Sequence, residues 1–387
     1  MAFIAQQESV STPLIWVSEQ GTDKSLLDAL TQILARGAQS LMILACSANN
    51  HSPRVLESSL QSYPIPICGG IFPSVFYADT KLDKGFILVG FPFVISVTNY
   101  DLSVNQTAPD FNSPLVRDAE QPQSSFDLLV FIDAMANATE PFINVLYETL
   151  GGGIDVIGGG AGSIDFKQRP CVFSRKGLLM NTALVVRLPV PMQCAVEHGW
   201  EVLNGPYLVT EAEDTKIKTL NYLPAFDVYK NVIEEIADYK FTKENFFQIS
   251  QNFPLGILSI NDDILVRDPI QVRGKELFCV GSVPVNSMIY ILSGNDEHIV
   301  RAAENAGVLA HKESQTANQE SLNFSLVFDC VSRVLYLGDK FPQEMAAIQR
   351  GLGGQRSIVG ALSIGEIANT CRGTINLLNK SIVIGNI

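Results

Sequence analysis

One pattern of apolar and polar residues occurs three times along the chain. Each copy has an apolar run typical of a buried strand, a stretch with helical spacing, and a glycine-rich turn that opens another apolar strand. The first runs of the three copies are residues 41–46, 128–133 and 326–330. A repeated unit of this size predicts a pseudo-symmetric fold, with the three glycine turns in equivalent places.

The order of elements within each copy favours mixed sheets. A wholly parallel sheet needs a crossover between successive strands, whereas here hairpins follow each helix. We therefore expect a mixed α/β (α+β) fold. Its form would be a pseudo-symmetric two-lobe protein built from repeated β-α-β-β units, with mixed sheets and outer helices.

The pattern changes after the second copy. Residues 199–210 and 216–223 alternate apolar and polar side chains, which predicts paired strands. Pro224 and Ala225 then open a helical stretch. We place a domain boundary here, which divides the chain into residues 27–224 and 225–387.

Composition narrows the range of partners. Hydrophobic residues make up 47% of the 387 residues and charged residues 17%, so large cores are expected. The formal charge of −13 disfavours nucleic acid and anionic membrane surfaces. No apolar run reaches the roughly 20 residues of a spanning helix, and the first residues lack a signal-peptide pattern. We expect a soluble, cytoplasmic protein without membrane insertion.

The glycine turns are the first candidate site. Residues 158–163 resemble a phosphate-binding loop, but the Gly-Lys-Ser/Thr of a P-loop is missing and no helix follows. A tight entry into a strand is the favoured interpretation, because glycine permits close backbone approach. The alternative is a ligand pocket lined by these turns, which would include Gly69, Gly70, Gly159, Gly160 and Ser163.

Histidine and charged residues give further candidates. The four histidines are scattered, and no hydrolase or zinc motif occurs. His198 lies beside Trp200 and could ligate a metal or haem iron, or merely hydrogen-bond the backbone near a strand start.

Arg267, Arg333 and Glu366 stand in or beside apolar strand sequence, which predicts that they are buried and that at least one arginine pairs with a carboxylate. Such a pair could bridge the lobes, or an arginine could grip a ligand carboxylate.

Several segments resemble one known family, and they occur in its order along the chain. They are Gly199-Trp200, Val209-Thr210, Pro224-Ala225 with Tyr229, residues 254–257, 266–269 and 330–333, and Ser363 to Glu366. They are similar to FIST proteins, which carry FIST N-terminal and C-terminal sensory domains. The resemblance spans about 27–369 and departs from the family at residues 68–74, where a Gly-Cys-Ser-Thr-like turn is usual.

The resemblance implies an intracellular sensing module of the kind found with bacterial signal-transduction partners. It suggests small ligands such as amino acids, or haem in the subset that senses nitric oxide and acts on a histidine kinase. No kinase, cyclase or receiver sequence is attached, so the output would pass through another protein. The ligand-binding candidates are Arg267, Arg333, Glu366, Ser363, Gly69, Gly70, Gly159, Gly160 and Ser163, with His198 for haem.

Three functions compete at this point. The leading one is a non-enzymatic sensor that binds a small ligand or haem and regulates a partner. The second is an enzyme with Cys330 or Cys68 as nucleophile, which needs an activated thiolate. The third is a scaffold with an oligomeric interface and no ligand. The seven cysteines form no CxxC motif, so small buried thiols are the expected default.

Overall fold

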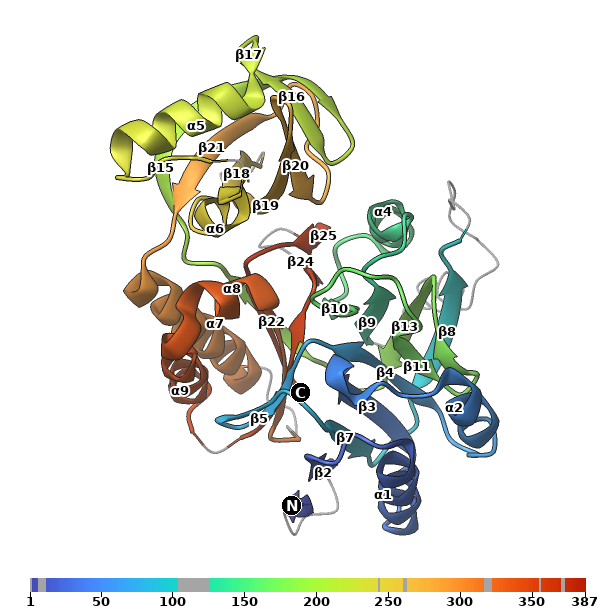
Figure 1. Ribbon diagram of the computed structural model, residues 1–387. Helices are drawn as coiled ribbons and strands as arrows, with labels where there is room; N and C mark the ends of the chain where they lie inside the picture. The colour runs from blue at the N-terminus through green and yellow to red at the C-terminus, as the bar shows by residue number, and fades with distance from the viewer. Residues whose placement is uncertain are drawn as a thin grey trace.

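The computed structural model describes residues 2–5, 12–103, 126–242, 244–259, 263–316, 322–354, 356–369 and 373–387. Three related units form one body, and a barrel is inserted into the third unit (Figure 1). The mixed α/β fold with repeated units is therefore as predicted.

Each unit has an outer strand, a first strand, a helix, a second strand, a hairpin and a return strand. The first unit comprises β2 (Leu14–Ser18), α1 (Asp23–Ala35), β3 (Ser40–Cys46), α2 (Pro53–Leu60), β4 (Ile67–Phe72), β5 (Val75–Tyr77), β6 (Thr80–Leu82) and β7 (Phe86–Phe91), with β1 (Ala2–Ala5) paired to β2. The second comprises β8 (Ser96–Asp101), β9 (Asp127–Asp133), α4 (Thr139–Leu150), β10 (Val156–Ala161), β11 (Val172–Ser174), β12 (Gly177–Leu179) and β13 (Thr182–Leu188). The third comprises β14 (Gln193–Glu197), α7 (Asp296–Thr316), β22 (Phe324–Cys330), α8 (Val331–Leu337), α9 (Phe341–Gly351), β23 (Ser357–Ser363), β24 (Glu366–Asn369), β25 (Ile375–Leu378) and β26 (Ile382–Asn386).

Strand pairing relates the three units by a pseudo-threefold arrangement. In each unit the first and second strands are parallel, and the return strand is antiparallel to the first. Each hairpin leaves its own unit and extends a neighbour's sheet. The hairpin β11–β12 pairs with β4, β24–β25 pairs with β10, and β5–β6 pairs with β23. The exchange is cyclic, so no unit completes its sheet alone.

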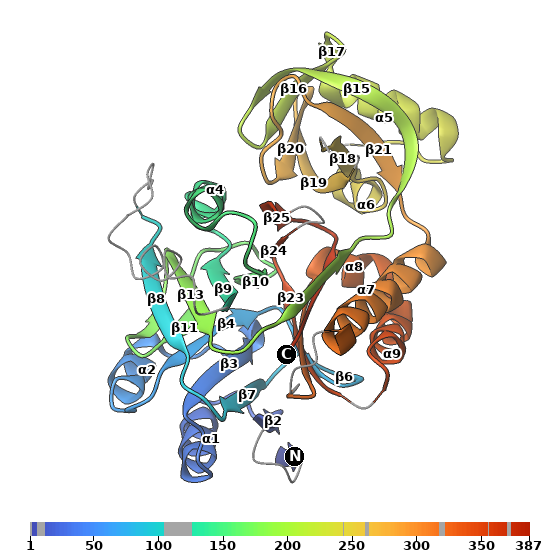
Figure 2. The ribbon, with the colours of Figure 1, turned by 180° about the vertical axis from the view of Figure 1, so that it is seen from behind.

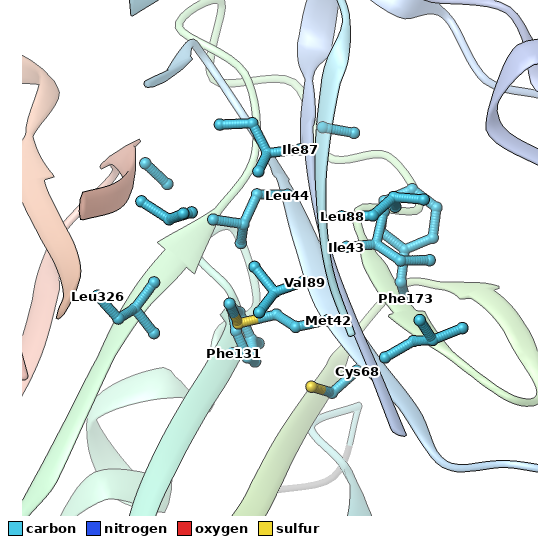
Figure 3. Close-up of a cluster of buried hydrophobic side chains, with 14 of the residues drawn as sticks. Met42, Ile43, Leu44, Cys68, Ile87, Leu88, Val89, Phe131, Phe173 and Leu326 are labelled. Atoms are coloured by element: carbon cyan, nitrogen blue, oxygen red, sulfur yellow. The ribbon is translucent and has the colours of Figure 1, made fainter. Parts of the chain in front are cut away.

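One aromatic ring from each unit meets at the centre of the body. Phe72 of β4, Phe131 of β9 and Phe328 of β22 are fully buried, with ring centroids 5.8 to 6.5 Å apart. Figure 3 shows Phe131 in the same apolar cluster as Met42 and Leu326. This contact between units explains why the first strands are apolar on both faces.

The predicted glycine turns are the interiors of the second strands. Gly69, Gly159 and Gly360 lie within β4, β10 and β23, and all three are buried. A Cβ on Gly159 would lie 2.5 Å from the Phe328 ring and 2.9 Å from the Ser363 Cβ. Glycine is therefore needed for close packing between units, and the predicted turns that open a strand lie instead inside the strands.

The inserted barrel consists of β15 (Glu201–Glu213), β16 (Lys216–Leu220), β17 (Leu223–Pro224), α5 (Ala225–Ile236), α6 (Phe246–Ser250), β18 (Leu255–Leu258), β19 (Ile264–Arg273), β20 (Glu276–Val280) and β21 (Met288–Ser293). The long strand β15 pairs with β21 along its first half and β16 along its second half, which closes the barrel. Two neighbouring segments connect it to the body (Figure 2).

The predicted boundary lies inside this barrel. Residues 224 and 225 separate β17 from α5, so strands on both sides of the boundary belong to one closed sheet. The division into domains 27–224 and 225–387 stays a prediction.

Candidate ligand site

A cavity of about 190 Å³ lies where the barrel meets the body. We call it the junction cavity. Strands β19 and β20 and helix α6 supply one wall, and the end of β22 with α8 supplies another. Its lining residues are Ile164, Phe166, Phe247, Asp268, Ile270, Val280, Cys330, Val331, Ser332, Leu335, Ile364, Gly365 and Asn379.

Two buried acceptors stand in this mostly apolar lining. Asp268 is 3% exposed and Asn379 is 2% exposed. The Oδ2 of Asp268 accepts from Ser332 Oγ at 2.8 Å and contacts Lys380 Nζ at 3.3 Å, whereas its Oδ1 has no partner among the described residues. The Nδ2 of Asn379 donates to Leu378 O at 2.9 Å, and its Oδ1 is likewise without a partner in the described structure. Buried polar atoms of this kind usually have partners, so both call for an explanation.

Burial raises the pKa of Asp268, and the neighbouring Lys380 ammonium opposes that shift. Lys380 is itself fully buried, donates to Gln251 O at 3.0 Å and lies over the Trp200 ring at 4.9 Å. The barrel and the body thus meet in a charged pair between Asp268 of β19 and Lys380 of the turn before β26.

Apolar side chains surround the mouth of the junction cavity. Ile164, Phe166, Phe247 and Leu335 are between 42% and 46% exposed, although all four are large and apolar. They come from the loop after β10, from α6 and from α8. An exposed apolar rim around buried acceptors is typical of a small-molecule site.

Arg267 holds the barrel to the body beside this cavity. Its guanidinium contacts Glu140 Oε1 at 3.3 Å and donates to Leu377 O at 3.0 Å and Ser282 O at 2.9 Å. It is 4% exposed, and burial lowers its pKa while Glu140 opposes that shift. The predicted Arg–Glu bridge is confirmed, and these protein acceptors occupy the guanidinium.

The structure brings Arg333, Ser363 and Glu366 together in one buried network. Arg333 donates to Glu344 Oε1 at 3.0 Å and to Ile299 O at 3.0 Å. Ser363 Oγ donates to Glu366 Oε1 at 2.8 Å. Burial raises the pKa of Glu366 to about 8. These three residues are fully buried, as predicted for both charged ones, and they do not line the junction cavity. Their ligand-binding role stays a prediction.

The structure places the four glycines of the predicted site and its serine in different surroundings. Gly69, Gly70, Gly159 and Gly160 are buried in strands, where added Cβ atoms would contact neighbouring protein atoms at 3.0 Å or less. Ser163 instead lines a second cavity of about 270 Å³, together with Ser47, Asn50, His51, Pro53, Ile71, Asp133, Met135, Gly162, Lys167, Arg169, Pro170 and Cys171. Residues 162–171 contribute to the walls of both cavities.

His198 is a hydrogen-bonded residue of the junction between β14 and β15. Its Nδ1 accepts the backbone N–H of Trp200 at 2.9 Å, and burial lowers its pKa to about 4. The ring is therefore neutral with its proton on Nε2, a form that does not suit iron binding through Nε2. His198 lines neither cavity. The surroundings of His198 do not fit a haem site in this conformation.

The two candidate nucleophiles, Cys68 and Cys330, are buried thiols. Burial raises the pKa of Cys68 and of Cys330 well above the usual thiol range, and Glu366 adds to the shift at Cys330. A thiolate nucleophile needs the opposite shift, a lowered pKa.

Among the described residues, no cluster of three or more histidine, cysteine or acidic side chains could hold a metal ion. Nor is any helix in the described part of the chain long and apolar enough to cross a membrane.

Comparison with sequence models of known families shows the family to which the chain belongs. The sequence model of the FIST N domain matches residues 40–222, and that of the FIST C domain matches residues 225–369. The chain belongs to the FIST family. FIST domains are small-ligand-sensing domains of signal transduction and are generally non-enzymatic. A comparison with curated proteins found no match.

The sequence did not single out Asp268 and Asn379. Asp268 follows Arg267 within the apolar strand β19. This pair of adjacent charged residues is the feature of the sequence that could have marked Asp268 as a candidate. Asn379 lies in a short turn between two strands, and nothing in its local sequence distinguishes it from a surface turn residue. Only the packing of the barrel on the body brings both into one cavity.

Proposed function

We propose that this FIST protein is a non-enzymatic sensor whose ligand site is the junction cavity. The observation that carries the proposal is an apolar cavity between the barrel and the body, which has exposed large apolar side chains in its lining together with two polar residues, Asp268 and Asn379. The cavity is small compared with the roughly 300–1,000 Å³ of drug-sized sites, which favours a small metabolite.

The position of the cavity suggests how binding would be communicated. Asp268 belongs to the barrel and Asn379 to the body, so one ligand would contact both parts. A bound ligand would contact both the barrel and the body only when the two are packed together. Binding would therefore favour that packed arrangement over one in which they are apart. The altered surface would regulate a separate signalling protein, such as a histidine kinase, in the cytoplasm. An amino acid is the metabolite class that the family suggests.

A thermal-shift screen of the full chain against amino acids, amines and other small metabolites tests this function, with calorimetry on each hit. A true ligand stabilises the folded state by about 2.7 kcal/mol at one hundred times its dissociation constant. Ile270→Trp should fill the junction cavity and abolish binding, whereas Ser163→Trp fills the second cavity and should leave it intact. The reverse pattern would assign the site to the second cavity.

The same purified protein can be used to test the two alternative functions. Haem with nitric oxide sensing predicts a Soret band after reconstitution, and His198→Ala should change it if His198 is the axial ligand. The cysteine-enzyme alternative predicts rapid alkylation of Cys330 or Cys68 by iodoacetamide at neutral pH. We expect slow alkylation at both thiols because burial opposes thiolate formation.

A further inference from the structure

Apolar side chains make up most of the surface that the junction cavity offers to a ligand. Most of its described lining residues are aliphatic or aromatic. Four of them are between 42% and 46% exposed: Ile164, Phe166, Phe247 and Leu335. A hydrocarbon group that binds here would remove its own apolar surface and part of theirs from water, which is favourable.

The polar groups of the lining are bonded to the protein or covered by it. Ser332 Oγ donates to Asp268 Oδ2 at 2.8 Å, and Asn379 Nδ2 donates to Leu378 O at 2.9 Å. The Oδ1 atoms of Asp268 and Asn379 are buried as well, so they present almost no surface to a ligand. Burial raises the pKa of the Cys330 thiol, which therefore stays neutral. These groups offer a ligand little hydrogen bonding.

The described lining also lacks an unpaired charge that could hold an ionic ligand. Asp268 is the only charged residue among the described lining residues, and its carboxylate is already paired with Lys380 Nζ at 3.3 Å. A ligand carboxylate would lie in the same cavity as Asp268 without a cation of its own. A ligand ammonium would lose its hydration for a carboxylate that is already paired. Burial of an ion without a partner is costly, so the cavity disfavours charged and zwitterionic molecules.

The volume of the cavity limits the size of the ligand. An apolar protein cavity of about 150 Å³ is large enough to bind benzene. The junction cavity measures about 190 Å³, which leaves room for one ring with a short substituent.

We infer that the junction cavity binds an uncharged, largely hydrocarbon molecule of about one ring, and that it discriminates against amino-acid zwitterions and other ions. This inference rests on the proposed function, because it names the ligand class of the same site. The ring would contact Ile270 and Val280 of the barrel and Val331 and Ile364 of the body. Apolar contact with both parts would then stabilise their packed arrangement.

A series of related probes tests the inference by calorimetry on the full chain. Toluene is the uncharged hydrocarbon probe. Benzyl alcohol and benzylamine replace one methyl hydrogen of toluene by a hydroxyl or an ammonium, benzoate replaces the methyl group by a carboxylate, and phenylalanine is the zwitterion. We expect toluene to bind at least roughly tenfold more tightly than the three charged probes, with benzyl alcohol in between. The heat-capacity change of toluene binding should be negative, as burial of apolar surface requires.

Variants of the rim locate the binding. Leu335→Ala and Phe247→Ala should each weaken toluene binding at least roughly threefold, because each removes apolar surface from the mouth of the cavity. Leu309→Ala is the matched control. Leu309 is also a helix leucine that is 42% exposed, as Leu335 is, but it is not among the described lining residues, so binding should be unchanged. All three positions are exposed, which makes loss of folding an improbable cause of any difference.

The outcomes separate this inference from the function on which it rests. Tighter binding of a charged probe than of toluene, abolished by Ile270→Trp, would overturn the ligand class and retain a sensor with this site. Toluene binding that Leu335→Ala, Phe247→Ala and Ile270→Trp all leave intact would place the apolar site elsewhere and overturn the inference. Failure of toluene to bind would overturn it too. The proposed function would then stand only if another molecule of the wider screen binds in a way that Ile270→Trp abolishes, and without such a molecule both fail.

Discussion

At the scale of residues, buried charged side chains lie where different segments of the chain pack together. Arg267, Arg333 and Glu366 each stand out as a charge in apolar sequence, and all three are buried. Their partners could not be predicted, because Glu140 is 127 positions from Arg267, and Glu344 reaches Arg333 only through the packing of α9 beside α8. A strand pattern reports the burial of a residue but not which distant side chain faces it.

Arg333 allows a direct measurement of such a pair. Arg333→Ala would leave Glu344 and Asp329 buried without their cation, so we expect the free energy of unfolding to fall by about 3–5 kcal/mol in chemical denaturation. Arg350→Ala is the matched control, because it removes an exposed arginine–glutamate pair with Glu304 and should cost less than about 1 kcal/mol. Equal losses in the two variants would contradict the buried network.

Glu366 predicts the pH dependence of stability. Its pKa is raised from 4.5 to about 8, mainly by burial, so the folded state keeps a proton that the unfolded chain has lost. That contribution to stability is fully present below pH 4.5 and is lost as the pH rises to about 8. The limiting slope is roughly 1.4 kcal/mol per pH unit.

Glu366→Gln stays neutral at every pH. The free energy of unfolding should then fall less steeply between pH 5 and 8, although Asp329 and Glu344 keep part of the slope because burial raises their pKa values too. Denaturation at several pH values measures the difference. An unchanged slope would mean that Glu366 is ionised in the folded protein.

At the scale of elements, strands and helices of the repeat followed from the sequence, but the exchange of hairpins did not. The apolar runs that form β3, β9 and β22 and the amphipathic stretch of α4 follow directly from local periodicity. The choice of partner sheet for each hairpin depends on contacts between units far apart in the chain. For the same reason, the glycines of β10 looked like a turn, although they are strand residues in close contact with the third unit.

Gly159 tests that close contact. Gly159→Ala would place a Cβ within 2.5 Å of the buried Phe328 ring, so we expect a loss of about 1–3 kcal/mol from overpacking. Gly153→Ala is the control, since a Cβ there meets no atom within 4 Å. Denaturant titration of both proteins gives the comparison, and a loss no larger than that of the control would argue against tight packing between the second and third units.

At the scale of the whole molecule, the two parts of the protein do not coincide with the two halves of the sequence. The barrel begins and ends at adjacent positions, because Glu201 and Ser293 are paired across β15 and β21. A Cβ on Gly294 would lie 2.6 Å from the Trp200 ring, so the residues that flank the barrel are also in contact. A chain that leaves and re-enters a body at one point is typical of an inserted domain.

This geometry predicts which fragments fold. Replacement of residues 201–293 by a short Gly-Ser linker should give a body that unfolds cooperatively, because each of its three sheets keeps every strand. A fragment of residues 225–387 should not, since its barrel lacks β15, β16 and β17 and its body lacks two complete units. Circular dichroism during thermal unfolding distinguishes the two. Cooperative unfolding of the 225–387 fragment alone would instead support the boundary at residue 225 as a division between independent domains, and would show that the cyclic exchange of hairpins is not needed to hold the third unit together.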